Sequence, residues 1–347
     1  MSGTEVTGVS IDAARLGAWI AATLGGAAAP VQVTRLKGGQ SNPTYLVTRG
    51  PDRYVLRRKP SGTLLQSAHA VDREYRVMAA LAGSDVPVAR VHALCEDDEV
   101  IGTAFYLMEF IEGRVLWDPA LPGVAPAERG RMYDELNRVI AALHAVDPYA
   151  VGLADYGRHG EYVARQVSRW SRQYLASRTE SIEAMDRLIA WLPEHVPVDD
   201  ETRIVHGDYR LDNVIFHPRE PRIVAVLDWE LSTLGAPLSD FAYHCMVWRV
   251  EPGLFRGLAG YDLGALGIPT EAECVAAYCR RTGRAGIAAR DWEYYMVFNM
   301  FRLASIMQGI MARALSGTAA GSEALEMGRR ARPLAELAWR QVERMSS

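Results

Sequence analysis

The side chains best suited to chemistry in this sequence are gathered in one short segment. His206, Gly207 and Asp208 are followed by Asn213, five residues after Asp208, and Asp228 stands fifteen residues further on, at the end of an apolar run. Phosphoryl transfer needs a carboxylate that orients the attacking hydroxyl and accepts its proton, and ligands that hold Mg²⁺ on the phosphates. Asp208 fits the first role. Asn213 and Asp228 fit the second, because Mg²⁺ prefers hard oxygen ligands and takes few carboxylates.

The elements that must position these residues divide into a strand-rich part and a helical part. Strands are expected near residues 31–36, 44–48, 53–57, 88–94 and 104–111, with one helix over residues 68–81. Helices are then expected near residues 126–146, 158–178, 181–192, 237–248, 270–283, 290–315 and 321–345. A polar loop between short strand-like segments at residues 204–216, and an apolar strand at residues 223–227, interrupt the helices. We therefore expect an N-terminal helical extension (1–29), a nucleotide-binding sheet with one helix (30–112) and a helical part with the acceptor site (113–347).

The two polar motifs resemble those of the aminoglycoside phosphotransferase family, within the protein-kinase-like superfamily. Residues 206–213 resemble that family's catalytic loop, and residues 227–230 resemble its metal-binding motif. The resemblance covers roughly residues 30–310. It implies an α+β, two-lobed kinase-like fold, with a small antiparallel-sheet lobe and a large, mostly helical lobe. It also implies an enzyme that uses ATP and Mg²⁺ to phosphorylate a hydroxyl of a small molecule.

The strand at residues 54–57 resembles the one that normally ends in the phosphate-binding lysine. Here that position holds Arg57, which keeps the positive charge and adds a planar fork suited to phosphate. Lys59 is the alternative for this role. By fold analogy, Glu74 on the following helix is expected to form an ion pair with Arg57. The alternative for Glu74 is a solvated helix residue between two arginines.

Two backbone segments complete the expected nucleotide site. Residues 38–44 stand where the phosphate-covering loop should lie, and Gly39 and Ser41 are expected to offer backbone amides to phosphate. An ordinary hairpin turn is the alternative. Residues 108–113 resemble the hinge between lobes, where the backbone of Glu109 and Ile111 is expected to bind the adenine edge.

Several charged residues bear on the acceptor. Arg210, two residues after Asp208, is expected to steady the transferring phosphoryl group or a second anionic group; the alternative is a loop arginine paired with Asp212. Arg302 interrupts an apolar helix and needs a partner. We expect Arg302 to pair with Asp240 or Glu230, or to hold an anionic substrate, and we count both Arg302 and Glu230 among the candidate substrate residues.

The acceptor class rests on charge and on a narrower resemblance. Residues 231–347 contain 11 Asp or Glu and 13 Arg, so this region lacks the acidic excess that would favour a cationic antibiotic. Residues 55–60, 69–75, 206–213 and 301–304 resemble the kinase-like domain fused to some acyl-CoA dehydrogenases. That resemblance implies an acceptor hydroxyl on an acyl chain, such as a hydroxyacyl-CoA or a hydroxy acid. The alternatives are an aminoglycoside O-phosphotransferase and a nucleotide-binding pseudokinase regulator.

Composition and charge argue against several other classes of protein. The net charge of −4 argues against a nucleic-acid-binding protein. Residues 16–34 carry no charge but are diluted by Gly, Pro and Ala, and we read no signal peptide, so we expect neither a membrane span nor secretion. The four cysteines form no Cys-x-x-Cys pair, which is typical of a reducing compartment. We therefore expect a cytoplasmic protein.

Overall fold

The computed structural model describes residues 11–26, 29–36, 42–60, 71–198, 201–317 and 322–346. The chain divides into two compact units. The first holds Met1–Gly113 and Val224–Leu231, and the second holds Arg114–Ile223 and Ser232–Ser347. The first unit thus includes residues 224–231, which were expected in the helical part, and also the helix that was expected as a separate N-terminal extension.

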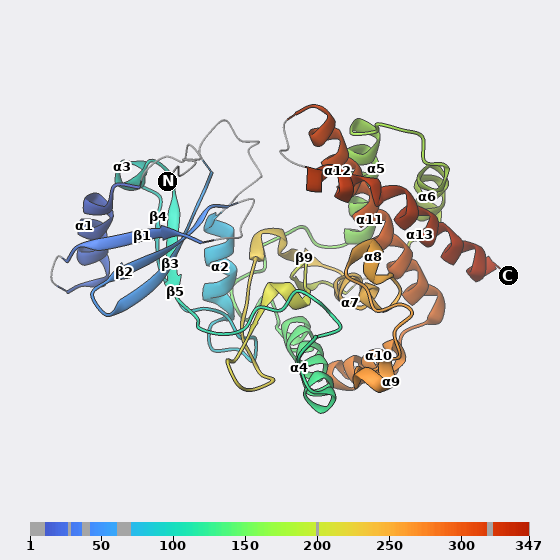
Figure 1. The fold of residues 1–347 in the computed structure, drawn as a ribbon, viewed down its shortest axis with the longest axis horizontal. Helices are drawn as coiled ribbons and strands as arrows, with labels where there is room; N and C mark the ends of the chain where they lie inside the picture. Colours follow the sequence, from blue (N-terminus) through green and yellow to red (C-terminus); the bar gives the residue numbers. More distant parts are fainter. Residues whose placement is uncertain are drawn as a thin grey trace. The chain divides into compact units, whose positions relative to one another are not determined.

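The first unit is built on a five-stranded antiparallel sheet (Figure 1). In spatial order the strands are β1 (Val31–Arg35), β2 (Thr44–Arg49), β3 (Asp52–Arg58), β5 (Phe105–Glu109) and β4 (Val91–Cys95). The turn between β2 and β3 contains Gly50, whose φ of 58° lies in the left-handed region that glycine adopts without steric cost. Each strand overlaps a range expected from the sequence.

The two faces of this sheet have different environments, because side chains alternate along each strand. One face is covered by α1 (Ala13–Leu24) and α3 (Asp98–Ile101), and the other carries α2 (Val71–Leu81) (Figure 1). The apolar core on the α1 side includes Leu16, Ile20, Val47, Leu56, Phe105 and Leu107. Since Leu56 belongs to this core, its neighbour Arg57 lies on the face that carries α2.

Short strands frame the polar loop of the second unit. β6 (Arg203–Val205) pairs antiparallel with β9 (Thr233–Gly235). After the loop come a 3₁₀ turn at Leu211–Asn213 and β7 (Val214–Phe216). β8 (Ile223–Val226) begins in the second unit and runs into the first, where a 3₁₀ turn, Trp229–Leu231, follows it.

The rest of the second unit is helical. Its α-helices are α4 (Pro126–Ala145), α5 (Tyr162–Ala176), α6 (Glu183–Glu194), α7 (Pro237–Cys245), α8 (Pro252–Phe255), α9 (Leu263–Leu266), α10 (Glu271–Thr282), α11 (Ala289–Leu315), α12 (Ser322–Arg329) and α13 (Ala331–Ser346). A further 3₁₀ turn, Met246–Trp248, extends α7. The long helix α11 packs against α5, α7, α12 and α13 (Figure 1), which explains its buried run of methionines and aromatic residues.

The C-terminal segment differs from the single helix expected over residues 321–345. The structure has two helices, α12 and α13, separated at Arg330. Pro333 lies in the first turn of α13, where its missing N–H costs no hydrogen bond, whereas it would break a helix that continued from α12. None of the helices in the described part of the chain is both long enough and apolar enough to cross a membrane.

Candidate active site

The polar loop at residues 206–213, called here the 206–213 loop, is held by a buried carboxylate. Asp240 on α7 accepts hydrogen bonds from the backbone N–H of His206 and of Gly207, each at 2.8 Å. Its Oδ2 atom also lies 3.2 Å from Nε2 of His144 on α4. Burial alone would raise the pKa of Asp240, but the hydrogen bond and charge of His144 and the donors from His206 outweigh it and lower the pKa. The loop is therefore anchored by an ionised, buried acceptor.

A second anchor comes from α11. Arg302 Nη2 donates to the carbonyl oxygen of Gly207 at 2.6 Å, and the guanidinium lies over the ring of Tyr243, 4.9 Å from its centroid. Gly207 itself has a φ of 83°, a conformation that side chains with a Cβ rarely adopt. Arg302, expected to pair with Asp240 or Glu230 or to hold an anionic substrate, hydrogen-bonds to the backbone of the loop.

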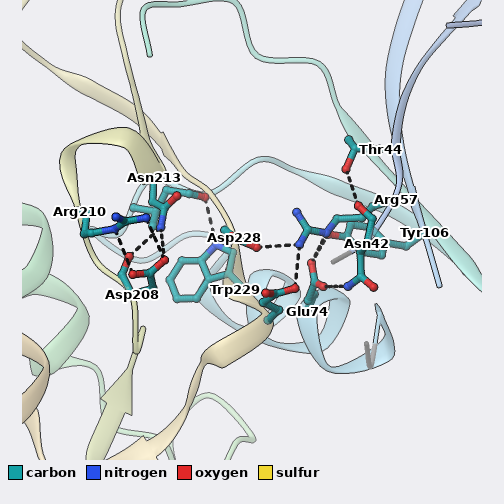
Figure 2. Close-up of polar contacts among 12 residues, drawn as sticks. Asn42, Thr44, Arg57, Glu74, Tyr106, Asp208, Arg210, Asn213, Asp228 and Trp229 are labelled. Carbon is teal, nitrogen blue, oxygen red and sulfur yellow. Dashed lines mark hydrogen bonds and ion pairs between the residues drawn. The ribbon is translucent and has the colours of Figure 1, made fainter. Parts of the chain in front are cut away.

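The 206–213 loop brings three of the predicted site residues together (Figure 2). Nε of Arg210 lies 3.1 Å from Oδ1 of Asp208, and Nδ2 of Asn213 donates to Oδ2 of Asp208 at 2.9 Å. The same Asn213 nitrogen lies 2.8 Å from the Asp208 carbonyl oxygen. An amide whose nitrogen is engaged in this way presents its oxygen, Oδ1, to a cation, which suits the predicted metal role of Asn213.

Arg210 forms the pairing with Asp212 that was the alternative to a contact with the transferring phosphoryl group. Besides Asp208, it approaches Asp212, with 3.3 Å between Nη2 and Oδ2. Arg210 therefore joins the two carboxylates of the loop, and the pairing with Asp212 does not remove it from Asp208.

In the first unit, Arg57 on β3 lies at the centre of a cluster of carboxylates (Figure 2). Its Nε is 2.8 Å from Oε2 of Glu74 on α2, so the structure contains the expected ion pair. Its Nη2 is 2.7 Å from Oδ1 of Asp228 and 3.6 Å from Oε2 of Glu230. The alternative cation, Lys59, is more exposed, and its Nζ lies 3.9 Å from Oδ1 of Asp72. Of the two candidates, Arg57 is the one paired with Glu74.

Glu74 is buried, and each of its two carboxylate oxygens accepts a hydrogen bond. Asn42 Nδ2 donates to its Oε1 at 2.6 Å, and the hydroxyl of Tyr106 donates to its Oε2 at 3.0 Å. Burial raises the pKa of Glu74, although the charge of Arg57 and these two hydrogen bonds act in the opposite direction. Burial lowers the pKa of Arg57, but the charges of Glu74 and Asp228 outweigh it, so the guanidinium stays protonated.

Asp228 follows β8 and has an unusual backbone. Its φ is 63°, in the left-handed region that residues other than glycine seldom occupy, although Asp tolerates it better than most. Its side chain is 35% exposed, and the next residue, Trp229, is buried and donates Nε1 to the Val226 carbonyl oxygen at 3.1 Å. The buried indole fixes the turn that presents the Asp228 carboxylate.

The remaining predicted nucleotide contacts are backbone positions. Glu109 ends β5, where its N–H donates to the carbonyl oxygen of Arg90 at 2.8 Å, and Ile111 lies two residues beyond the strand. Gly39 and Ser41 lie outside the described residues.

Sequence reasoning missed the residues that support the site. Asp240 was considered only as a partner for Arg302, and Asn42, Tyr106 and His144 were not considered at all. One signal was available for Asp240, because it is the acidic residue in the mostly apolar helix expected at residues 237–248. The others contact their partners across 32 or more residues of sequence, which local pattern does not reveal.

Known proteins resemble this chain over most of its length. Acyl-CoA dehydrogenase family member 10 of Mus musculus is 47% identical over 312 residues, which are 89% of this chain and 29% of that protein. A protein of Ralstonia eutropha, provisionally described as an aminoglycoside phosphotransferase, is 56% identical, and its crystal structure matches 95% of this chain and 98% of its own with a TM-score of 0.88.

A more distant structure shares the fold alone. A thermostable mutant of aminoglycoside phosphotransferase APH(4)-Ia, in a ternary complex with AMP-PNP and hygromycin B, is 16% identical. It matches 94% of this chain and 98% of its own with a TM-score of 0.59. The expected α+β, kinase-like fold is therefore confirmed.

The family itself is shown by a match along the chain. Residues 32–295 match the model of the phosphotransferase enzyme family, a range that contains Arg57, Glu74, Asp208, Asn213 and Asp228. The chain therefore belongs to the phosphotransferase enzyme family and is a small-molecule phosphotransferase.

Proposed function

We propose that this phosphotransferase moves the γ-phosphate of ATP to a hydroxyl group of a small acceptor in a Mg²⁺-dependent reaction. The observation that carries the proposal is the Asp208 carboxylate, held between Arg210 and Asn213 in the 206–213 loop. Asp208 orients the acceptor hydroxyl and takes its proton. The hydroxyl oxygen then bonds to the γ-phosphorus, the bond from that phosphorus to the β-phosphate oxygen breaks, and ADP leaves.

Asn213 and Asp228 are the proposed metal ligands. Both offer hard oxygen atoms, and the nitrogen of the Asn213 amide is occupied by Asp208, so its oxygen is the atom suited to a cation. When bound, Mg²⁺ offsets the negative charge of the phosphates.

The cluster around Arg57 is the proposed phosphate grip. Its guanidinium is suited to bind phosphate oxygens through its fork of N–H donors, while Glu74 holds the Nε side of that fork at 2.8 Å. The backbone of Gly39 and Ser41 is proposed to contact phosphate. The backbone of Glu109 and Ile111 is proposed to contact adenine.

For the acceptor we propose a hydroxyacyl-CoA or a hydroxy acid. Support comes from relatives such as Acyl-CoA dehydrogenase family member 10 of Mus musculus and member 11 of Homo sapiens, which match 89% of this chain. The chain spans only 29% and 40% of these two relatives, so their dehydrogenase names describe far longer proteins. A kinase acting on a hydroxylated acyl chain would fit beside such chemistry.

An aminoglycoside O-phosphotransferase is the second candidate, favoured by the description of the 56% identical Ralstonia eutropha protein. The intact set of Asp208, Asn213 and Asp228 argues against the remaining candidate, a nucleotide-binding pseudokinase regulator.

The test is transfer of label from γ-radiolabelled ATP, with Mg²⁺, to a panel of hydroxy acids, hydroxyacyl-CoAs, amino alcohols and aminoglycosides. We expect label on the hydroxylated acyl compounds. Transfer to aminoglycosides alone would overturn the acceptor proposal and leave the phosphotransfer proposal standing. Tight Mg·ATP binding with no transfer to any compound would favour the pseudokinase.

A further inference from the structure

Two of the four cysteines lie in contact within the second unit. Cys245 ends α7, Cys274 lies near the start of α10, and their Sγ atoms are 3.9 Å apart. Both are buried free thiols, separated by 29 residues of sequence. A disulfide bond can form only between cysteines that the fold already brings this close. Neither thiol has a part in the proposed reaction.

The sulfur pair is one of two contacts between the same faces of α7 and α10. Phe241 precedes Cys245 by four residues and Tyr278 follows Cys274 by four, so each pair of residues shares one face of its helix. The rings of Phe241 and Tyr278 are stacked, with 3.9 Å between centroids and 10° between planes. The packing of the two helices therefore holds the sulfur atoms next to each other.

The two thiols differ in their access to solvent. Cys274 lines a pocket that opens at the surface and that Asn137 of α4 and Ala277 of α10 also line. Cys274 is 4% exposed, whereas Cys245 is completely buried. A small oxidant such as hydrogen peroxide would therefore meet Cys274 first, and Cys245 lies behind it as a second thiol in contact. Reactive cysteines of redox-sensitive proteins are often arranged in this way.

The surroundings of Cys274 favour its thiolate, which is the reactive form of a cysteine. Asn137 Nδ2 lies 3.2 Å from Sγ of Cys274 and donates to the Cys274 carbonyl oxygen at 2.8 Å. The Asn137 amide is fixed in this orientation, because its Oδ1 accepts a hydrogen bond from Nη1 of Arg281 at 2.7 Å. The hydrogen bond from Cys245 and the one from Asn137 lower the pKa of Cys274 although burial opposes them, whereas burial raises the pKa of Cys245.

The same two helices hold the anchor of the 206–213 loop. Asp240, which accepts hydrogen bonds from the loop backbone, lies on α7, and its Oδ2 is 3.2 Å from Nε2 of His144. Nδ1 of His144 lies 2.7 Å from the hydroxyl of Tyr278 on α10. A disulfide bond is about 2.05 Å long, so closing one draws α7 and α10 together at this point. A close-packed interior passes such a shift to its neighbours, and here the neighbours include Asp240.

We propose that Cys274 and Cys245 form a reversible oxidation site: a peroxide closes a disulfide bond between α10 and α7, and this bond slows the enzyme by displacing the Asp240 anchor of the 206–213 loop. The inference concerns control of the enzyme and requires no particular acceptor.

The chemistry has two steps. The Cys274 sulfur attacks one oxygen of hydrogen peroxide, the O–O bond breaks, and one water leaves, so that Cys274 becomes a sulfenic acid. The Cys245 sulfur then attacks the Cys274 sulfur, the S–O bond breaks, and a second water leaves. Two thiols are thus oxidised to a disulfide while the peroxide is reduced to water. A thiol reductant reverses the reaction by thiol–disulfide exchange.

The experiment treats the full chain with increasing hydrogen peroxide and then with dithiothreitol. Mass spectrometry of non-reduced peptides locates any disulfide, and dimedone labels sulfenic acid. Hydrogen exchange over residues 203–213 and kcat are measured before oxidation, after it and after reduction. The variants are Cys245→Ala and Cys274→Ala. Cys279→Ala is the matched control, because Cys279 is also a buried cysteine of α10 but lies five residues beyond Cys274.

We expect wild type to yield a peptide pair joined through Cys245 and Cys274. Oxidation should lower kcat and accelerate exchange over residues 203–213, each by at least about fivefold, and dithiothreitol should restore both. Cys245→Ala should carry dimedone on Cys274, because the second thiol is missing, and Cys274→Ala should form no disulfide and keep its kcat. Cys279→Ala should respond to peroxide as wild type does.

Three results would overturn the inference. They are four free thiols after peroxide treatment, pairing of Cys274 with a cysteine other than Cys245, and a bond between Cys245 and Cys274 that leaves kcat and exchange unchanged. Wild type alone shows whether the bond forms, so a variant that fails to fold leaves the test intact. If wild type transfers phosphate to no acceptor, the proposed function is wrong, while the peptide map and the exchange of residues 203–213 still decide this inference.

Discussion

Replacing Asp240 with asparagine should loosen the 206–213 loop and slow the reaction, although Asp240 touches neither proposed substrate. Each of its two oxygens accepts one backbone N–H, from His206 and from Gly207, both at 2.8 Å. Asparagine has the same shape but only one acceptor oxygen, so one of these buried N–H groups would face an amide NH₂.

The magnitude follows from these two bonds. A hydrogen bond to a charged group contributes about 1.5–3 kcal/mol, and a buried donor left without a partner costs about 1–3 kcal/mol. Losing one bond and weakening the other should therefore reduce the local stability of the loop by about 2–4 kcal/mol. A loss of about 2 kcal/mol corresponds to roughly 30-fold more frequent opening of the loop.

Hydrogen exchange measured by mass spectrometry on peptides that cover residues 203–213 reports this opening directly. We expect exchange there to accelerate at least about 30-fold in Asp240→Asn, with a lower kcat. Asp134→Asn is the matched control, because Asp134 forms an exposed ion pair with Arg281 and such pairs contribute little. Wild-type exchange and wild-type kcat in Asp240→Asn would refute the positioning role.

Three other predictions concern charge. Glu74→Gln and Arg57→Ala should each weaken Mg·ATP binding about tenfold in calorimetry, because the first removes the charge that holds Arg57 and the second removes the guanidinium itself. Unchanged affinity in both variants would contradict the phosphate grip. Asp228→Ala should bind ATP equally with Mg²⁺ or with EDTA, and a retained Mg²⁺ effect would count against its metal role. Folding lowers the pKa of Asp240. The free energy of unfolding that its carboxylate contributes is therefore fully present above about pH 3.9, the pKa of Asp in an unfolded chain. That contribution is lost as the pH falls through the lower pKa of the folded protein. The free energy of unfolding of Asp240→Asn, measured in urea, should therefore depend less on pH in this acidic range than that of wild type. The same pH dependence in both proteins would contradict this prediction.

The grouping of Asp208, Arg210 and Asn213 was readable from the sequence, because these residues lie close together along the chain. The five-residue step from Asp208 to Asn213 predicted that one loop would carry both, and the structure places their side chains 2.9 Å apart. The contact between Arg57 and Glu74 was anticipated by fold analogy, and the structure places Nε of Arg57 2.8 Å from Oε2 of Glu74.

The supporting residues were not readable in this way. Tyr106 and Asn42 reach Glu74 only after the sheet and α2 have assembled, and His144 reaches Asp240 across 96 residues. Local pattern does not encode such contacts, because they depend on which elements pack together. The break between α12 and α13 was missed for a different reason: the helical spacing continues through it, and the position of Pro333 marks a helix start that periodicity alone does not detect.

The most direct test of the central claim is single-turnover transfer of γ-phosphate from Mg·ATP to a hydroxylated acyl acceptor, comparing wild type with Asp208→Asn, while nucleotide affinity is measured on the same samples. We expect Asp208→Asn to bind Mg·ATP within about threefold of wild type and to transfer phosphate at least about a hundredfold more slowly, as loss of a general base requires. Transfer at the wild-type rate by Asp208→Asn would contradict the assignment of Asp208 as the catalytic base.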